Sequence, residues 1–261
     1  MSPAAPRILV CNDDGIASPG LALLATAAQG LSGDVWVVAP SRKWTAASHQ
    51  LTYDRDIVLV EDGPRRYVCD GAPADCVVAA MTLLVDGAAP FDLALAGIND
   101  THNVGEDSAY SGTMSIAREA TFWGVPAIAV SRSARWTDTA PEIAALRRLL
   151  SAAWATRSEW AAEGHWLGVN LPPRLPAALR GARLARDKIA SAVDIVEHTQ
   201  GRWVYRVRRG RPGSVTAGDE NDVLRVGHVA VVRHGARHAG ALDDDWLARM
   251  AAALADDEPV G

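Results

Sequence analysis

The sequence predicts an α/β protein with a Rossmann-like, doubly wound and mostly parallel sheet, followed by a smaller antiparallel C-terminal appendage or arm. Short apolar runs with β-branched residues alternate with helical segments up to about residue 171, which is typical of a parallel sheet. Beyond residue 175, extended segments separated by turn residues indicate antiparallel pairing. We therefore expect a core over residues 1–175. Residues 176–261 are expected to form an extension with a C-terminal helix that serves oligomerisation and packs back on the core.

Each strand of the core is predicted from an apolar run that ends at turn-forming residues. Strands are expected at residues 8–11, 34–39, 57–60, 66–69, 91–96 and 127–131, and a last strand of the main sheet at 166–171. Ser18 and Pro19 predict a helix start, as N-cap and first helical residue. Further helices are expected at residues 76–85, 111 to about 123, and 141–163. The appendage is expected to contain strands at 182–185, 194–198, 203–207 and 223–232, and a helix at 243–254.

The first predicted strand ends abruptly in the acidic turn Asn12-Asp13-Asp14-Gly15. In open α/β folds such a turn lies at the carboxyl edge of the sheet, where ligands bind. Adjacent carboxylates at a half-buried strand end raise each other's pKa, and a cation between them removes that cost. Carboxylate oxygens are hard ligands suited to magnesium, manganese or calcium. Taken alone, the motif slightly favours a plain polar turn, because Asp and Gly dominate turns.

Three more polar segments fall at predicted strand ends or helix starts. They are a loop at residues 41–50 that contains Thr45, a segment at 99–103 that begins with Asn99, and Ser111-Gly112-Thr113. At a shared sheet edge, two carboxylates, one hydroxyl and one amide oxygen would supply four oxygen ligands. The hydroxyls and free N–H groups of a helix start would hold an anion. A metal beside an anion site predicts phosphate ester hydrolysis, with the metal polarising phosphoryl oxygens and lowering the pKa of a bound water.

Six motifs in sequence order make the chain similar to a known family. They are NDDG with SPG (residues 12–20), VVAP (37–40), GAPADC (71–76), AGIN with NVGED (96–107), YSGT (110–113) and VNLPP (169–173). Because they keep the family's approximate spacing over most of the chain, the chain resembles the SurE-type 5′/3′-nucleotidases, the survival protein SurE family. Members of this family are metal-dependent phosphomonoesterases that act on nucleoside monophosphates.

The resemblance implies a Rossmann-like core and four ligands for a divalent cation, Mg²⁺ or Mn²⁺: Asp13, Asp14, Thr45 and Asn99. It implies a second set that holds the substrate phosphate: Asn103, Ser111, Gly112 and Thr113. Asp13 and Asp14 are then the catalytic residues, and a metal-activated water attacks phosphorus in line with Asp14 or its partner as proton acceptor. The resemblance also implies a homodimer or homotetramer, with the C-terminal arm exchanged between subunits.

The chain departs from the family's pattern in places that concern substrate and assembly. Thr45 stands where the family usually has Ser, so the hydroxyl is kept and a methyl is added. The loop from Asn99 to Asn103 lacks the family's Gly and Pro and adds the titratable His102. Near the C-terminus, residues 230–233 replace the family's Ser-x-Thr-Pro segment. The metal site is therefore expected to be intact, while another small phosphate ester or polyphosphate remains an alternative substrate.

Composition narrows the function classes. The chain has 261 residues, 49% of them hydrophobic, and a net charge of −5, which is ordinary for a globular protein and excludes a non-specific nucleic-acid binder. The cysteines Cys11, Cys69 and Cys76 form no CxxC pair and are expected to be buried free thiols in a reducing compartment. The N-terminal sequence has no long apolar segment, so neither a signal peptide nor a membrane span is expected. A cytoplasmic protein without membrane or nucleic-acid partners is the expectation.

Two further functions are weighed against the phosphomonoesterase. A receiver domain of signalling systems also carries an acidic pair after its first strand, but it needs a lysine at the end of a later strand, and neither Lys43 nor Lys188 sits at such a position. A non-catalytic, metal-dependent nucleotide-binding protein stays open. A haloacid-dehalogenase mechanism would need a second Asp where Gly15 stands. His102 is considered as a proton donor to the leaving oxygen, and Trp44 as a ring that stacks on a base or sugar.

Overall fold

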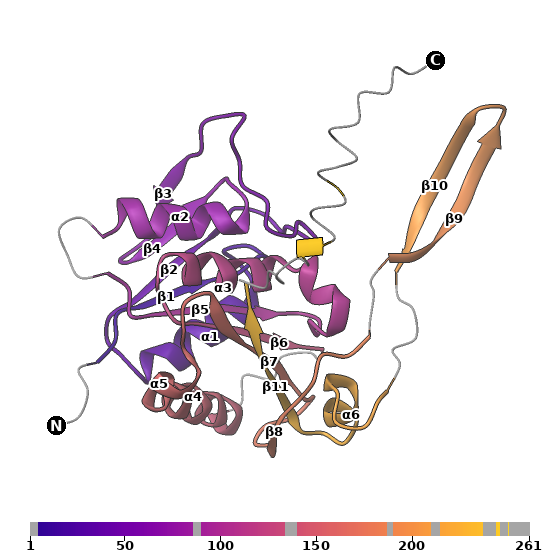
Figure 1. The fold of residues 1–261 in the computed structure, drawn as a ribbon. Helices are drawn as coiled ribbons and strands as arrows, with labels where there is room; N and C mark the ends of the chain where they lie inside the picture. Colours follow the sequence, from indigo (N-terminus) through magenta and orange to yellow (C-terminus); the bar gives the residue numbers. More distant parts are fainter. Residues whose placement is uncertain are drawn as a thin grey trace.

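A nine-stranded sheet forms the body of the protein (Figure 1) in a computed structural model that describes residues 5–85, 90–133, 140–186, 190–209 and 215–236, together with 244, 245 and 250. Its strand order is β3-β4-β2-β1-β5-β6-β7-β11-β8. The strands from β4 to β7 run parallel, whereas β3 is antiparallel to β4 and β11 is antiparallel to β7. The predicted doubly wound, mostly parallel sheet is therefore confirmed.

The strands of this sheet are short and mostly buried. They are β1 (Ile8–Cys11), β2 (Val35–Pro40), β3 (Leu59–Glu61), β4 (Arg66–Cys69), β5 (Leu93–Asn99), β6 (Ala127–Arg132), β7 (His165–Leu171), β8 (Leu179–Gly181) and β11 (Val229–Gly235). Every residue of β1, β5 and β6 is buried, as expected for central strands of a sheet covered on both faces.

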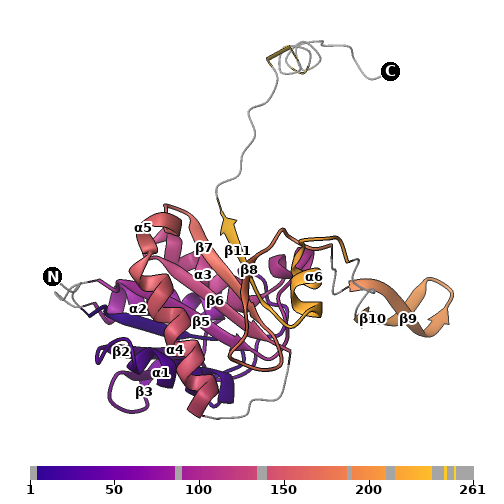
Figure 2. The ribbon, with the colours of Figure 1, turned by 90° about the horizontal axis from the view of Figure 1, so that it is seen from below.

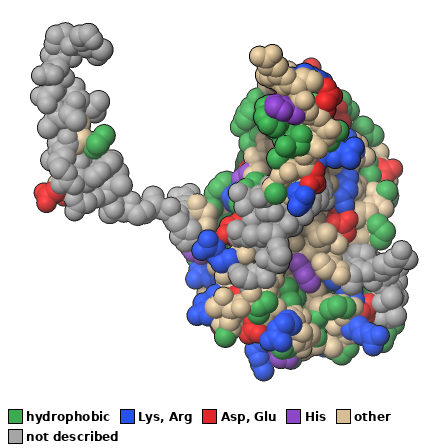
Figure 3. Space-filling view, turned by 90° about the vertical axis from the view of Figure 1, so that its right-hand side faces the viewer, with side chains coloured by type: hydrophobic (Ala, Val, Ile, Leu, Met, Phe, Trp, Pro, Cys, Tyr) green, Lys and Arg blue, Asp and Glu red, His purple; other side chains and the backbone are tan. Residues whose placement is uncertain are grey.

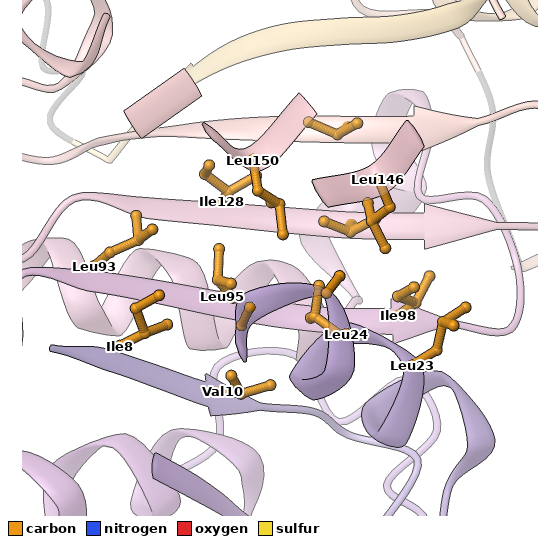
Figure 4. Packing of buried hydrophobic residues seen from close by; sticks show 14 of the residues in the cluster. Ile8, Val10, Leu23, Leu24, Leu93, Leu95, Ile98, Ile128, Leu146 and Leu150 are labelled. Carbon is orange, nitrogen blue, oxygen red and sulfur yellow. The ribbon is translucent and has the colours of Figure 1, made fainter. Parts of the chain in front are cut away.

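Helices cover both faces of the sheet (Figures 1 and 2). Helices α1 (Pro19–Gln29) and α4 (Ala140–Ala155) lie on one face, and α2 (Pro73–Leu83) and α3 (Gly112–Phe122) lie on the other. Shorter helical turns are η1 (Gly105–Ala109), α5 (Arg157–Trp160) and α6 (Glu220–Arg225). Each face has its own apolar cluster, and Figure 4 shows Leu23 and Leu24 of α1 packed over the strands.

The sheet order creates a topological switch between β1 and β5. From β1 the chain moves outward to β2 and β4, then returns to β5 and moves outward on the other side through β6 and β7. In open α/β sheets the crevice at the carboxyl ends of such neighbouring strands binds ligands. Gly20 lets α1 pack closely beside this point, because a Cβ there would lie 2.2 Å from the carbonyl oxygen of Ile98 in β5.

Several predicted elements need correction. The helix expected at 141–163 is two helices, because the chain turns at Thr156 and Trp160 folds back to donate its ring N–H to the carbonyl oxygen of Ala153. The strand at 166–171 is not the last of the main sheet, because β11 pairs beside it. The strand expected at 182–185 lies instead at β8, which pairs with β11.

The strand expected at residues 223–232 is also wrong in its first half. Asp219 accepts a hydrogen bond from the Asp222 N–H at 2.8 Å and so caps helix α6, which occupies this part of the chain. Gly227, with φ +78°, then turns the chain into β11. Most of the helix expected at 243–254 lies outside the described residues. The domain division at residue 175 stays a prediction, and β8 and β11 join the main sheet from beyond it.

The predicted antiparallel appendage is confirmed as a long hairpin of β9 (Ala190–Thr199) and β10 (Arg202–Arg209), which stands away from the body (Figures 1 and 2). It leaves large apolar side chains exposed: Val193, Ile195, Val196, Trp203, Tyr205 and Val207. Figure 3 looks onto the side from which the hairpin projects, where hydrophobic and basic side chains are interspersed. Among the described residues, no helix combines the length and apolar character needed to cross a bilayer.

Candidate active site

A cavity of about 360 Å³ opens at the carboxyl ends of β1 and β5, at the topological switch. Its walls come from the turn after β1, the loop after β2, the loop after β5 and the start of α3. The lining residues are Asp13, Asp14, Lys43, Thr45, Ala46, Asn99, Asp100, Thr101, His102, Asn103, Asp107, Tyr110 and Ser111. Six of the eight residues proposed from the sequence as ligands or phosphate contacts are therefore brought together, and the other two, Gly112 and Thr113, lie directly behind Asp13.

The acidic turn after β1 is held by Asn12. The Asn12 side chain donates to the carbonyl oxygen of Gly15 at 3.1 Å and accepts from the Gly15 N–H at 3.2 Å. Gly15 has φ +99°, a conformation that favours glycine. This closed turn explains why two adjacent carboxylates, those of Asp13 and Asp14, face one cavity with fixed backbone positions.

Asp13 is buried and held by the start of α3. The Thr113 hydroxyl donates to Asp13 Oδ1 at 2.5 Å, and Thr113 itself is completely buried. Gly112 allows the close approach, because a Cβ there would lie 2.6 Å from the Cβ of Asp13. Burial raises the pKa of Asp13 to about 7, against the lowering effect of the Thr113 hydrogen bond. The negative charge of Asp14 adds to the rise in the pKa of Asp13, and the positive charge of Lys43 opposes it without cancelling it.

Asp14 contacts the only lysine of the first 187 residues. Lys43 Nζ lies 2.5 Å from Asp14 Oδ1 and 2.6 Å from Asp100 Oδ2. The second oxygen of Asp14, Oδ2, is buried and has no hydrogen-bond partner among the described residues. Burial alone would lower the pKa of Lys43, but the hydrogen bonds to Asp100 and Asp14 outweigh it and raise that pKa.

Asn99 and Thr45 both line the cavity and carry neutral oxygens. The Asn99 side-chain nitrogen donates to the carbonyl oxygen of Thr101 at 2.7 Å, and this bond orients the amide, so the amide oxygen is the group that can turn to a cation. Thr45 is exposed on the loop after β2. That loop carries left-handed backbone conformations at Ala46 (φ 56°) and Ser48 (φ 53°), which non-glycine residues seldom adopt outside functional sites.

The loop after β5 is fixed by a buried amide network. Asn103 donates its side-chain N–H to Ser131 Oγ at 2.7 Å, and its backbone N–H to Asn170 Oδ1 at 2.9 Å. Asn170 in turn donates to the completely buried Glu220 of α6 at 3.3 Å, and Glu220 accepts from the Gly105 N–H at 2.9 Å. Residues from beyond position 175 therefore hold a wall of the cavity in place.

The start of α3 reaches the same cavity through Ser111. Ser111 is the N-cap, and its hydroxyl accepts from the Met114 N–H at 3.1 Å. The helix has eleven residues, so its dipole and its first N–H groups favour an anion at this end. Ser111 reaches the cavity wall, whereas the Thr113 hydroxyl is directed to Asp13.

The two aromatic candidates are partly engaged elsewhere. One ring nitrogen of His102 lies 2.9 Å from the carbonyl oxygen of Leu171, to which it must donate, and burial lowers the pKa of His102. His102 lines the cavity, so a role as proton donor stays a prediction. Trp44 is covered by the guanidinium of Arg42, 4.1 Å from its ring centroid, and does not line the cavity.

Sequence analysis missed several groups that the fold brings to this site. Lys43 and Asp100 face the cavity through their ion pair, and Glu220 acts from a helix distant in sequence. The position of Lys43 two residues before Thr45 was the available signal, whereas no sequence pattern marked Glu220. Among the described residues, no three His, Cys, Asp or Glu side chains group into a metal site. A cation here would therefore need hydroxyl and amide oxygens besides the two carboxylates.

A family model and several named relatives point to the same family. The family model described as "Survival protein SurE" matches residues 8–193. A protein named 5′-nucleotidase SurE from Paramagnetospirillum magneticum is 36% identical over 81% of this chain and 85% of its own length. A protein named 5′-nucleotidase SurE 1 from Burkholderia lata is 35% identical over 88% of this chain and 90% of its own length.

A solved structure supports the same relationship. The crystal structure of the SurE protein from Aquifex aeolicus is similar to this chain with a TM-score of 0.73 and 27% sequence identity. The match covers 96% of this chain and 100% of the Aquifex aeolicus chain. The likeness therefore extends beyond the parallel core to the segments after residue 175.

Proposed function

Because this chain belongs to the survival protein SurE family, we propose that it is a metal-dependent phosphomonoesterase that hydrolyses nucleoside monophosphates, a 5′/3′-nucleotidase. Relatives named 5′-nucleotidase SurE cover most of the chain and support a phosphoric monoester hydrolase. The observation that carries the proposal is the meeting of Asp13, Asp14 and Asn99 with the N-terminus of α3 at one cavity.

The residues at the cavity fit a divalent cation, and we propose Mg²⁺ or Mn²⁺ with four ligands: Asp13, Asp14, Thr45 and Asn99. The fit rests on the buried Asp14 Oδ2, which lacks a hydrogen-bond partner among the described residues, and on the raised pKa of the buried Asp13. Both groups gain stabilisation from a neighbouring positive charge. Carboxylate, hydroxyl and amide oxygens are the ligands that hard divalent cations prefer.

We propose that the phosphate of the substrate lies at the start of α3, between Ser111, Gly112, Thr113 and Asn103. Ser111 contributes its hydroxyl and Gly112 and Thr113 contribute backbone N–H groups at the positive end of the helix. The Thr113 hydroxyl acts on Asp13, so we assign it the orientation of that carboxylate. Asn103 fixes the opposite wall through Ser131 and Asn170.

The residues of this site have different roles in an in-line attack of water on phosphorus. When bound, the cation supplies charge to the phosphoryl oxygens and lowers the pKa of water. Asp14 accepts the proton of the attacking water. The α3 N-terminus holds the non-bridging oxygens, and Asn103 and Tyr110 line the cavity that receives the phosphate.

The exposed apolar hairpin supports a homodimer or homotetramer in which the β9–β10 arm packs on another subunit. A two-stranded hairpin is marginal on its own, and its apolar side chains need cover. The buried free thiols Cys11, Cys69 and Cys76 support a reducing compartment, and we propose that the protein is cytoplasmic.

The test is release of inorganic phosphate from a substrate panel, with Mn²⁺ and Mg²⁺ compared and EDTA as the metal-free arm. The panel contains 5′- and 3′-nucleoside monophosphates, p-nitrophenyl phosphate, a sugar phosphate and a short polyphosphate. Turnover of nucleotides that EDTA abolishes is the expected result. Faster turnover of the sugar phosphate or the polyphosphate would show that this compound, and not a nucleotide, is the preferred substrate. If no compound is turned over in a metal-dependent way, the protein is a non-catalytic nucleotide-binding protein.

A further inference from the structure

The lysine at the cavity connects two carboxylates that differ strongly in exposure. Lys43 Nζ contacts Asp14, whose side chain is 8% exposed, at 2.5 Å, and Asp100, whose side chain is 57% exposed, at 2.6 Å. The ammonium group thus stands between the interior of the site and solvent. Asp100 is in contact with water, whereas the side chain of Asp14 is almost fully covered, so an ion pair is a larger part of its surroundings.

The position of Lys43 is set by the backbone on either side of it. The Ser41 N–H donates to the carbonyl oxygen of Cys69 at 2.7 Å, and the Trp44 N–H donates to the carbonyl oxygen of Asp13 at 2.8 Å. The second of these bonds ties the loop directly to the acidic turn. These two hydrogen bonds fix the backbone of residues 41–44, and this fixed backbone places the Lys43 side chain beside Asp14.

A divalent cation and an ammonium group compete for the negative charge of the same carboxylate. The proposed function makes Asp14 a ligand, and in this structure the ammonium already contacts Asp14 Oδ1. Two positive charges held at one carboxylate whose side chain is only 8% exposed repel each other. Asp100 offers the ammonium a second partner that does not need Asp14, so it can leave Asp14 and still be paired.

We propose that Lys43 is a built-in competitor for the divalent cation: its ammonium neutralises Asp14 in the metal-free protein and is held by Asp100 alone when the cation binds. This inference rests on the proposed ligand role of Asp14. Two consequences follow. The metal-free site is stabilised because its buried carboxylate is paired, and the affinity for the cation is lower than the same oxygens would give without the lysine.

The decisive experiment measures Mn²⁺ binding by titration calorimetry, in the absence of substrate, for the wild type and Lys43→Met. Removing the ammonium is expected to lower the Kd for Mn²⁺ by about tenfold or more, because the repulsion is lost. Arg42→Met is the matched control, since it removes the same charge from the neighbouring position, where the guanidinium lies on Trp44. At about 0.15 M salt, screening should keep its effect on Kd within about twofold.

Thermal unfolding supplies a second readout that does not involve turnover. Metal-free Lys43→Met is expected to unfold at a lower temperature than the wild type, because Asp14 is then buried without a counter-charge. The rise in Tm on adding Mn²⁺ is expected to be larger in Lys43→Met than in the wild type, since tighter binding stabilises the folded state more. Equal rises in both proteins would contradict the inference.

Failure of the inference and failure of the proposed function give different results. Mn²⁺ binding that Asp13→Asn abolishes, with Lys43→Met no tighter than Arg42→Met, overturns only the competition. Mn²⁺ binding that survives Asp13→Asn, or no Mn²⁺ binding by the wild type and Lys43→Met, overturns the ligand assignment and the competition with it. Tighter binding by Lys43→Met that still depends on Asp13 supports both.

Discussion

The cavity edge of the sheet and the β9–β10 hairpin differ in which side chains they bury and which they expose. At the cavity, polar groups such as Asp13, Asn103 and Glu220 are buried and hydrogen-bonded. In the hairpin, ion pairs such as Asp194–Arg208 are exposed, and so are apolar side chains such as Val207. Polar contacts should therefore have large effects in the first region and small ones in the second, whereas apolar substitutions in the hairpin should act on association.

Asp13→Asn is expected to have the largest effect of all. The substitution removes a negative charge from the proposed cation site while the Thr113 hydroxyl can still donate to the remaining oxygen. We expect kcat for p-nitrophenyl phosphate with Mn²⁺ to fall by about 10³-fold or more. The far-ultraviolet circular dichroism spectrum should be unchanged.

Asp62→Asn is the control for this experiment, because it removes the same charge from an exposed ion pair with Arg66. It should leave kcat unchanged. If Asp13→Asn keeps the wild-type rate, Asp13 has no role in catalysis. The expectation that polar contacts matter more at the cavity than in the hairpin would then be wrong.

His234 of β11, which stacks on Trp166 away from the cavity, extends the comparison to a covered titratable group elsewhere in the sheet. Burial and the nearby positive charge of Arg118 lower the pKa of His234 from 6.5 to about 4. The unfolded chain therefore binds more protons than the folded one between these values, so stability is full above about pH 6.5 and falls as pH decreases toward 4. The loss from this residue amounts to at most about 3 kcal/mol.

The measurement is the free energy of unfolding by urea at several pH values for the wild type and His234→Gln. The variant should show a flatter pH dependence below pH 6.5, because the titrating group has been removed. The control is His198→Gln in the hairpin, where the ring is exposed and stacked on Trp203. If His234→Gln keeps the full slope of the wild type, the burial of this group does not govern stability.

The residues at the cavity edge can be predicted from the sequence because their positions depend on neighbouring residues along the chain. Asp13 and Asn99 each follow an apolar run, and parallel strands place such positions at one edge. Lys43 escapes prediction because its direction depends on an unusual loop, with left-handed backbone at Ala46 and Ser48 that no glycine announces. Glu220 escapes because it meets Gly105 across 115 positions of sequence, a contact that only the completed sheet creates.

The hairpin itself was predicted from alternating segments around Gly201, yet its surroundings were not. Asp219 begins a helix with a side-chain cap, but the apolar residues that follow it in sequence suggested a continuous strand. The long helix expected before β7 was likewise too simple, since periodicity alone did not mark the turn at Thr156. Errors therefore gather where tertiary packing, and not local pattern, sets the boundary.

The hairpin's apolar side chains should matter for assembly and little for folding of the body. Val193 and Val207 are cross-strand partners and both are more than half exposed, at 51% and 55%. The double substitution Val193→Ser with Val207→Ser is expected to weaken subunit association about tenfold or more, measured by sedimentation velocity across a dilution series. Val60→Ser on β3, which is 54% exposed, is the matched control and should leave association unchanged. An unaltered sedimentation profile in the double variant would show that this face of the hairpin is not an interface.

The smallest effect is expected from the hairpin's ion pair. Asp194 and Arg208 contact each other on paired strands, and their side chains are 52% and 59% exposed. The hydrogen bond between them lowers the pKa of Asp194, but water and salt screen such an exposed pair, and holding two long side chains in one geometry costs entropy. Arg208→Ala should therefore leave Tm within about 1 °C of the wild type at moderate salt. A clear drop in Tm would mean that another subunit buries this pair, which would extend the proposed interface along β10.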